Sequence, residues 1–172
     1  MEKQPPKTGK FAWTYGLILG SLGVAFSAMF YFPEKIYREN SAAGIAQMII
    51  AAGLIIWAIY SFRKANDGFL KLSQGLKMGT GIMVITGILM ILYTILLSNV
   101  LDPEFAAKVM DFKLAEAAQE SNITPEQMQQ QKEMGIKYFW IGYPVILIMY
   151  VLFGLVVGLV GGLILKKAQP DY

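Results

Sequence analysis

The residues best placed to do chemistry in this sequence are two acids, Asp102 and Glu104, which flank Pro103 directly after an apolar segment. Two neighbouring carboxylates at a membrane surface are a pair that could hold a metal ion or act in acid–base catalysis. The same residues also form a helix start, with a capping Asp, a proline in the first turn and an acid near the positive end of the helix dipole. Since the helix start accounts for both acids, we expect neither a catalytic site nor a metal site here.

The sequence contains no Cys and no His. Disulfides, thiolate nucleophiles, the commonest zinc ligands and imidazole-based acid–base catalysis are therefore absent. We also find no P-loop, dinucleotide-binding fingerprint, catalytic triad or metal-ligand cluster. We expect that the protein is not an enzyme and that it uses no cofactor.

Polar residues inside the apolar segments are few and uncharged. Ionisable side chains within a membrane usually mark proton relays, ion coupling or charged-substrate sites, so their absence argues against a proton-coupled transporter or pump. Hydroxyl groups commonly bond their own helix backbone or a neighbouring helix, and an amide can bond across helices. We expect such structural roles for the uncharged polar residues of these segments, which are Thr14, Ser21, Ser27, Gln47, Thr80, Thr86 and Thr94.

Four apolar segments dominate the chain of 172 residues, which is 16% charged, whereas soluble domains average about 25%. A helix needs about 20 apolar residues to cross a hydrocarbon core about 30 Å thick, and each segment reaches that length. The first is too long for a signal-peptide core, so we interpret it as a retained span. The predicted fold is all-α, an integral membrane four-helix bundle in one domain, residues 1–172. Its spans are predicted at residues 11–32, 42–62, 78–97 and 139–165.

Basic residues are distributed unevenly between the two sides of the predicted membrane. The N-terminal tail, the loop after the second span and the C-terminal tail carry nine of the 15 Lys and Arg residues, against six on the other side. By the positive-inside rule, both termini are expected in the cytoplasm. We interpret the net charge of +3 as a topology signal and expect no nucleic-acid partner.

The long loop at residues 98–137 is predicted to form a helical hairpin. Asp102-Pro103-Glu104 starts one helix, and Thr124-Pro125-Glu126 starts a second that leads into the fourth span. Phe105, Val109 and Phe112 follow at helical spacing and would form one apolar stripe. The hairpin either binds a partner or caps the bundle, or it rests on the membrane surface or on the helix ends.

Seven glycines in the terminal spans repeat a common spacing. They are Gly16, Gly20 and Gly23 in the first span and Gly154, Gly158, Gly161 and Gly162 in the fourth. Small residues let helices approach closely in lipid, so these stripes are predicted helix-packing interfaces. The two spans run antiparallel in the predicted topology, and we expect their grooves to meet and close the bundle. In the alternative, one groove faces outward and receives a partner helix or a lipid chain.

Short motifs along most of the chain resemble a bacterial membrane family known as domain of unknown function 4199. They are Trp13-x-Tyr15-Gly16-Leu17-Ile18, Tyr60-x-x-Arg63, Gly68-Phe69-x-x-Leu72-x-Gln74-Gly75-Leu76-Lys77-x-Gly79, and Asp102-Pro103. The resemblance implies a four-helix inner-membrane protein of a kind typical of the Bacteroidetes. It implies no activity and supplies no catalytic residue.

Two functions from different classes fit these observations. The first is a non-enzymatic accessory or assembly subunit of a membrane complex, since the chain is small and lacks intramembrane charge and catalytic motifs. The alternative is a small transporter, pore or lipid-handling, flippase-like protein, for which the stretch Gly79-Thr80-Gly81 hints at irregular backbone in the third span. The expected partners are membrane lipid and either another membrane protein or a second copy of the chain.

Overall fold

The computed structural model describes residues 6–31, 41–120 and 124–167, and helices account for nearly all of them. In chain order they are α1 (Thr8–Tyr31), α2 (Ser41–Ala65), α3 (Leu72–Leu96), η2 (Leu97–Leu101), α4 (Phe105–Glu120), α5 (Pro125–Lys137), η3 (Phe139–Ile141) and α6 (Gly142–Leu165). Four segments, formed by α1, by α2, by α3 with η2, and by η3 with α6, are long and apolar enough to cross a membrane. The prediction of an all-α membrane bundle with four spans is confirmed.

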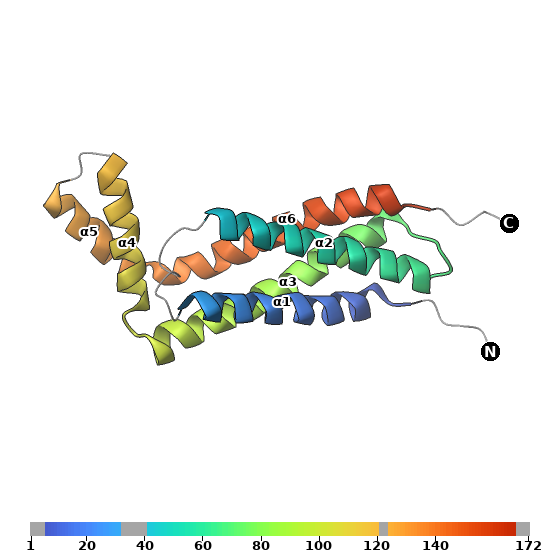
Figure 1. Cartoon of the computed structure of the whole chain (residues 1–172), viewed down its shortest axis with the longest axis horizontal. Helices are drawn as coiled ribbons and strands as arrows, with labels where there is room; N and C mark the ends of the chain where they lie inside the picture. Colours follow the sequence, from blue (N-terminus) through green and yellow to red (C-terminus); the bar gives the residue numbers. More distant parts are fainter. Residues whose placement is uncertain (1–5, 32–40, 121–123, 168–172) are drawn as a thin grey trace.

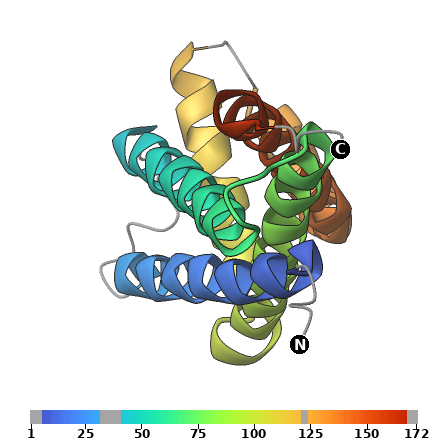
Figure 2. The same ribbon diagram turned by 90° about the vertical axis from the view of Figure 1, so that its right-hand side faces the viewer.

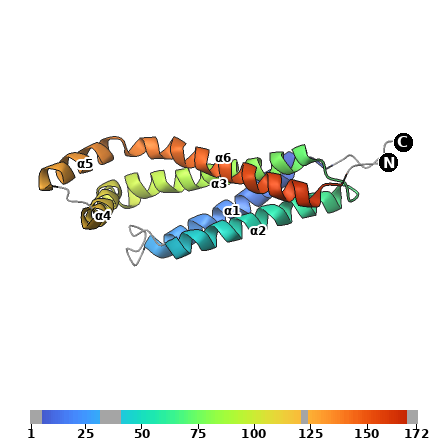
Figure 3. The same cartoon turned by 90° about the horizontal axis from the view of Figure 1, so that it is seen from above.

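The four long helices run side by side, and α4 and α5 project beyond one end of them (Figures 1 and 3). We name this the hairpin end. The start of α1 and the end of α6 both lie at the opposite end, which we name the basic end for its Lys and Arg residues (Figure 1). In the view along the bundle, α3 lies between α1 and α6 and packs against both (Figure 2).

The third span is longer than the sequence predicted. Its helix α3 begins at Leu72 instead of residue 78, and the Lys71 N–H donates a hydrogen bond to the Gln74 side-chain oxygen at 2.8 Å, which fixes the first turn. Residues 72–77, which the sequence placed outside the span, therefore form the start of α3 itself. At the other end, the wider turn η2 carries the span to Leu101.

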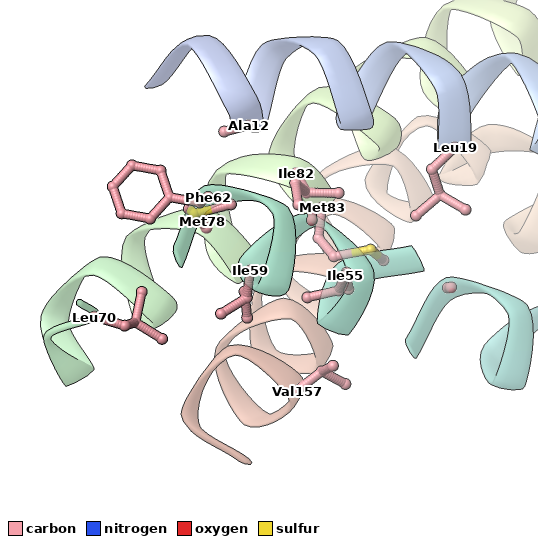
Figure 4. Packing of buried hydrophobic residues seen from close by; sticks show 12 residues of the cluster. Ala12, Leu19, Ile55, Ile59, Phe62, Leu70, Met78, Ile82, Met83 and Val157 are labelled. Atoms are coloured by element: carbon pink, nitrogen blue, oxygen red, sulfur yellow. The ribbon is translucent and has the colours of Figure 1, made fainter. Parts of the chain in front are cut away.

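The larger of the two hydrophobic clusters lies in the basic-end half of the bundle. Its fully buried side chains include Ile55, Ile59 and Phe62 of α2 and Met78 and Ile82 of α3 (Figure 4). In α2 every buried residue lies at position 51 or later, and in α6 every buried residue lies at position 154 or later. The hairpin-end half is therefore more open, a difference that the sequence did not predict.

A tight turn joins α2 to α3 at the basic end. Asp67 and Gly68 have φ values of 52° and 83°, a left-handed conformation that glycine adopts at little cost. The Arg63 guanidinium Nε donates a hydrogen bond to the Gly68 carbonyl oxygen at 2.9 Å. Leu70 and Lys167 then pair their backbones in an antiparallel bridge, which ties the end of α6 to this turn.

The extramembrane hairpin forms where it was predicted. The Thr124 side chain accepts a hydrogen bond from the Gln127 N–H at 3.3 Å, so the predicted cap of α5 is confirmed. Phe105 is buried against Leu97, and the partly buried Val109 and Phe112 pack on the same cluster. The apolar stripe of α4 thus covers the helix ends of its own chain.

Candidate functional site

Glycines line both sides of the contact between α3 and α6. A methyl group at Gly79 would clash with the Gly154 carbonyl oxygen and would lie 2.6 Å from the Gly158 Cα. One at Gly158 would lie 2.8 Å from the Gly75 carbonyl oxygen, and one at Gly75 would lie 2.7 Å from the Gly162 Cα. These distances are too short for any real side-chain carbon, so the two backbones can touch only because both helices carry glycine here.

The α1 glycines also face α3, but they meet mainly its side chains, and only Gly16 also lies close to α3 backbone, at the Ile82 carbonyl oxygen. A methyl group at Gly16 would lie 2.7 Å from the Ile85 Cβ, and one at Gly20 would lie 2.5 Å from the Leu89 Cδ1. At Gly23 the nearest atom is a methionine sulfur of α3, 3.1 Å away. The α1 groove is thus filled by larger side chains of α3.

The prediction that the grooves of the first and fourth spans meet each other is wrong. Both face α3, which lies between α1 and α6 (Figure 2). Of the four α6 glycines, Gly161 instead faces α2, where a methyl group would lie 3.0 Å from the Ile59 Cδ1. The physical reason is that the spacing of small residues defines a groove without defining its occupant, and α3 offers a complementary surface on each side.

The glycines of α3 were missed as interface residues, although their pattern was available in the sequence. Gly75, Gly79 and Gly87 recur at four and eight residues, so they share a face and match the four-residue spacing of the α6 glycines. The interpretation of the stretch around Gly79 and Gly81 as irregular backbone is wrong, because α3 is continuous from Leu72 to Leu96.

Several hydroxyl groups within the spans bind helix backbones or other hydroxyl groups of this chain. The Thr86 hydroxyl oxygen lies 2.9 Å from the Ile82 carbonyl oxygen of its own helix and 3.2 Å from the Gly16 carbonyl oxygen of α1. The Tyr15 hydroxyl donates to the Ser61 hydroxyl at 3.0 Å and so joins α1 to α2. Thr94 donates to a backbone oxygen of its own helix at 2.9 Å. Thr86 and Thr94 therefore have the structural roles that we expected.

Gln47 differs from these hydroxyl groups. Its side chain is exposed in the hairpin-end half of α2, and the hydrogen bonds of the described residues include none to its amide. The Gln47 amide thus lies within a span and makes no hydrogen bond to the part of the chain that the structure describes.

The acids at the start of α4 do not form a free carboxylate pair. Asp102 is buried, and both of its carboxylate oxygens lie 3.0 Å from the Lys108 Nζ. Its Oδ1 also accepts a hydrogen bond from the Glu104 N–H at 3.2 Å, as a helix cap does. Among residues 6–31, 41–120 and 124–167, no group of three or more acids, His or Cys is placed to hold a metal ion.

A small open pocket of about 240 Å³ lies between α4 and α5, outside the spans. Its lining residues are Asp111, Leu114, Pro125, Met128, Gln129 and Lys132. The Lys132 Nζ lies 2.6 Å from an Asp111 carboxylate oxygen, so the two charged groups of the lining neutralise each other. The pocket therefore offers no unpaired charge to a ligand.

Comparison with known families gives one match that covers most of the chain. The family described as "Protein of unknown function (DUF4199)" matches residues 14–167. Searches of curated proteins and of solved structures gave no match.

Replacing Gly158 by Leu should lower the unfolding free energy of the monomer by about 2 kcal/mol or more, because the new side chain would force apart the backbones of α3 and α6. Denaturation with sodium dodecyl sulfate in mixed micelles, followed by circular dichroism, measures the change. Gly53→Leu is the matched control, since no atom lies within 4 Å of a methyl group at Gly53. Equal stability of the two variants would contradict the packing role of the α3–α6 contact.

Replacing Thr86 by Val should cost about 1 kcal/mol, the usual size of a hydrogen bond between membrane helices, because it removes the hydroxyl that links α3 to α1. Thr94→Val is the control, because Thr94 donates only within its own helix. The same denaturation assay should show a clear loss of stability for the first variant and little for the second. A larger loss for Thr94→Val would remove the case for the interhelical bond.

Proposed function

The chain belongs to the DUF4199 family, and on that premise we propose that this multi-pass membrane protein is a non-enzymatic accessory or assembly subunit of a complex in a bacterial inner membrane. The observation that carries the proposal is the hairpin-end half of α2. Residues 44–50 are all exposed there, and they include large apolar side chains such as Ile45 and Met48. This segment belongs to a span and has few neighbours within its own chain.

The position of Gln47 supports a protein partner. Along α2, Gln47 lies on the same helix face as the buried residues Ala51, Ile55 and Ala58, at helical spacing. The face that builds the core in the basic-end half thus continues past the point where the other helices pack against it. A surface that continues a core stripe is suited to packing against another helix.

The chemistry of the amide favours a partner helix over lipid alone. A polar group that stays unsatisfied in hydrocarbon costs several kcal/mol, and lipid tails offer it no hydrogen bond. A partner helix with a hydroxyl, amide or carbonyl group would satisfy it, at about 1–2 kcal/mol for such a bond. The hydroxyls of Thr86, Thr94 and Tyr15 are already bonded within the chain, whereas the Gln47 amide has no hydrogen bond among the described residues, so we choose Gln47 as the candidate contact.

We further propose that both termini lie in the cytoplasm and that the α4–α5 hairpin lies in the periplasm. The start of α1 and the end of α6 lie at one end of the bundle, and the basic residues there fit the positive-inside rule (Figure 1).

Photo-crosslinking tests the proposed contact. The amino acid p-benzoylphenylalanine placed at Ile50, which is exposed and lies on the Gln47 side of α2, should crosslink to one membrane protein of defined mass, whereas the same probe at Ile49, on the opposite side of the helix from Gln47, should not. Gln47→Leu should reduce that crosslink at least fivefold, as expected for the loss of about 1 kcal/mol of hydrogen bonding, and Gln47→Asn should retain most of it. Crosslinks to a second copy alone, or to lipid alone, would contradict an accessory subunit.

Cysteine labelling tests the orientation, because the natural sequence contains no Cys. In spheroplasts, a membrane-impermeant maleimide should label Ala118→Cys in the hairpin and should not label Lys7→Cys, just before the first span at the basic end, until the membrane is lysed. Both positions are exposed in the structure, so exposure does not distinguish them. The reverse pattern of labelling would place the termini outside the cytoplasm.

A further inference from the structure

The basic end carries a dense set of cations around the bundle. They are Lys7, Lys10, Arg63, Lys64, Lys71, Lys77, Lys166 and Lys167. In the described part of the chain, Asp67 is the single acid at this end, and it lies exposed in the turn between α2 and α3. A face with this composition carries a strong positive potential.

Among the residues that the structure describes, none of these cations forms a salt bridge. The salt bridges recorded among the described residues all lie at the hairpin end, where Lys108 pairs with Asp102 and Glu104, and Lys132 pairs with Asp111. Two lysines of the hairpin thus have acidic partners, whereas no salt bridge is recorded for the described cations of the basic end. The excess of positive charge is therefore available to an anion from outside the chain.

The backbone bridge concentrates part of this charge at one place. Leu70 and Lys167 exchange two backbone hydrogen bonds, of 3.0 and 3.1 Å. In an antiparallel pair the neighbouring residues also lie opposite each other, with Cβ atoms about 5 Å apart, which here are Lys71 and Lys166. Both have extended backbones, with φ and ψ of −89° and 145° for Lys71 and −55° and 131° for Lys166, so they fit this geometry.

Two further cations lie at this bridge, Arg63 beside it and Lys167 within it. Arg63 uses its Nε to bond the Gly68 carbonyl oxygen, which leaves the other N–H groups of its guanidinium for a ligand. The Lys167 Nζ lies 5.8 Å from the centre of the Phe69 ring. The turn, the start of α3 and the end of α6 thus hold Arg63, Lys71, Lys166 and Lys167 around one short segment.

We propose that Arg63, Lys71, Lys166 and Lys167 bind the phosphate group of an anionic phospholipid. Opposed like charges are unfavourable unless an anion lies between them, and a phosphate accepts hydrogen bonds from lysine and arginine together. The cluster stands where three spans end, which is the depth of lipid headgroups. Basic pockets between membrane helices bind such headgroups. Such a site could form with the chain in either orientation in the membrane, whether or not the protein is an accessory subunit.

Native mass spectrometry of the purified full chain, titrated with phosphatidylglycerol or with phosphatidylcholine, tests this site. The natural chain should bind phosphatidylglycerol more tightly than phosphatidylcholine. The double variant K71Q/K166Q should lose about fivefold in affinity for each lysine removed. The charge-preserving variant K71R/K166R should keep the affinity, and circular dichroism should show the same helix content in every variant.

Two control pairs distinguish a built site from a generally positive surface. K64Q/K77Q removes the same charge at the basic end away from the bridge, and K113Q/K137Q removes it at the hairpin end. Both should keep most of the lipid preference. An equal loss in K64Q/K77Q would overturn the site, as would a natural chain without preference for the anionic lipid. Displacement of phosphatidylglycerol by inorganic phosphate at a comparable concentration would also overturn it, because the ligand would then be free phosphate.

Discussion

The α3–α6 contact has to hold within the lipid of a membrane, where no hydrophobic effect drives helices together. In lipid, association depends on dispersion contacts and on interhelical hydrogen bonds, and both increase as backbones come closer. Gly75 and Gly79 on one helix and Gly154 and Gly158 on the other remove the side chains that would keep the backbones apart. The rest of the bundle is arranged around this pair, since α1 packs on another side of α3, with α2 in contact with all three of these helices.

This contact also explains why the two ends of the molecule differ. The glycine pairs lie in the basic-end half, and the buried side chains gather in the same half (Figure 4). Close packing there brings the end of α6 to the turn after α2, where Leu70 and Lys167 can pair. Toward the hairpin end α2 has few neighbours among the described residues, and Phe105 and its neighbours from α4 instead cover the end of α3 and Phe139, just before α6.

Most of the architecture could be predicted from the sequence because it depends on local patterns. Span length follows from runs of apolar residues, and the cap of α5 follows from Thr124 and Pro125. The pairing of helices could not be predicted in the same way. A glycine stripe such as Gly16 and Gly20 defines a groove, but its occupant depends on the shape of every other helix. The openness around Gln47 was hidden for a similar reason, because a span exposed to lipid and a span buried in a bundle have equally apolar sequences.

The division into a closed half and an open half bears on how a partner could bind. The core residues Ile55, Ile59 and Phe62 are fully buried without any partner, so the bundle does not need one in order to pack its basic-end half. A helix that docks near Gln47 would add to a preformed structure and would not have to displace the α3–α6 contact. Docking onto a preformed surface avoids the ordering cost of folding on binding. On the proposed function, the exposed half of α2 would therefore act as a surface for rigid association and not as a moving part.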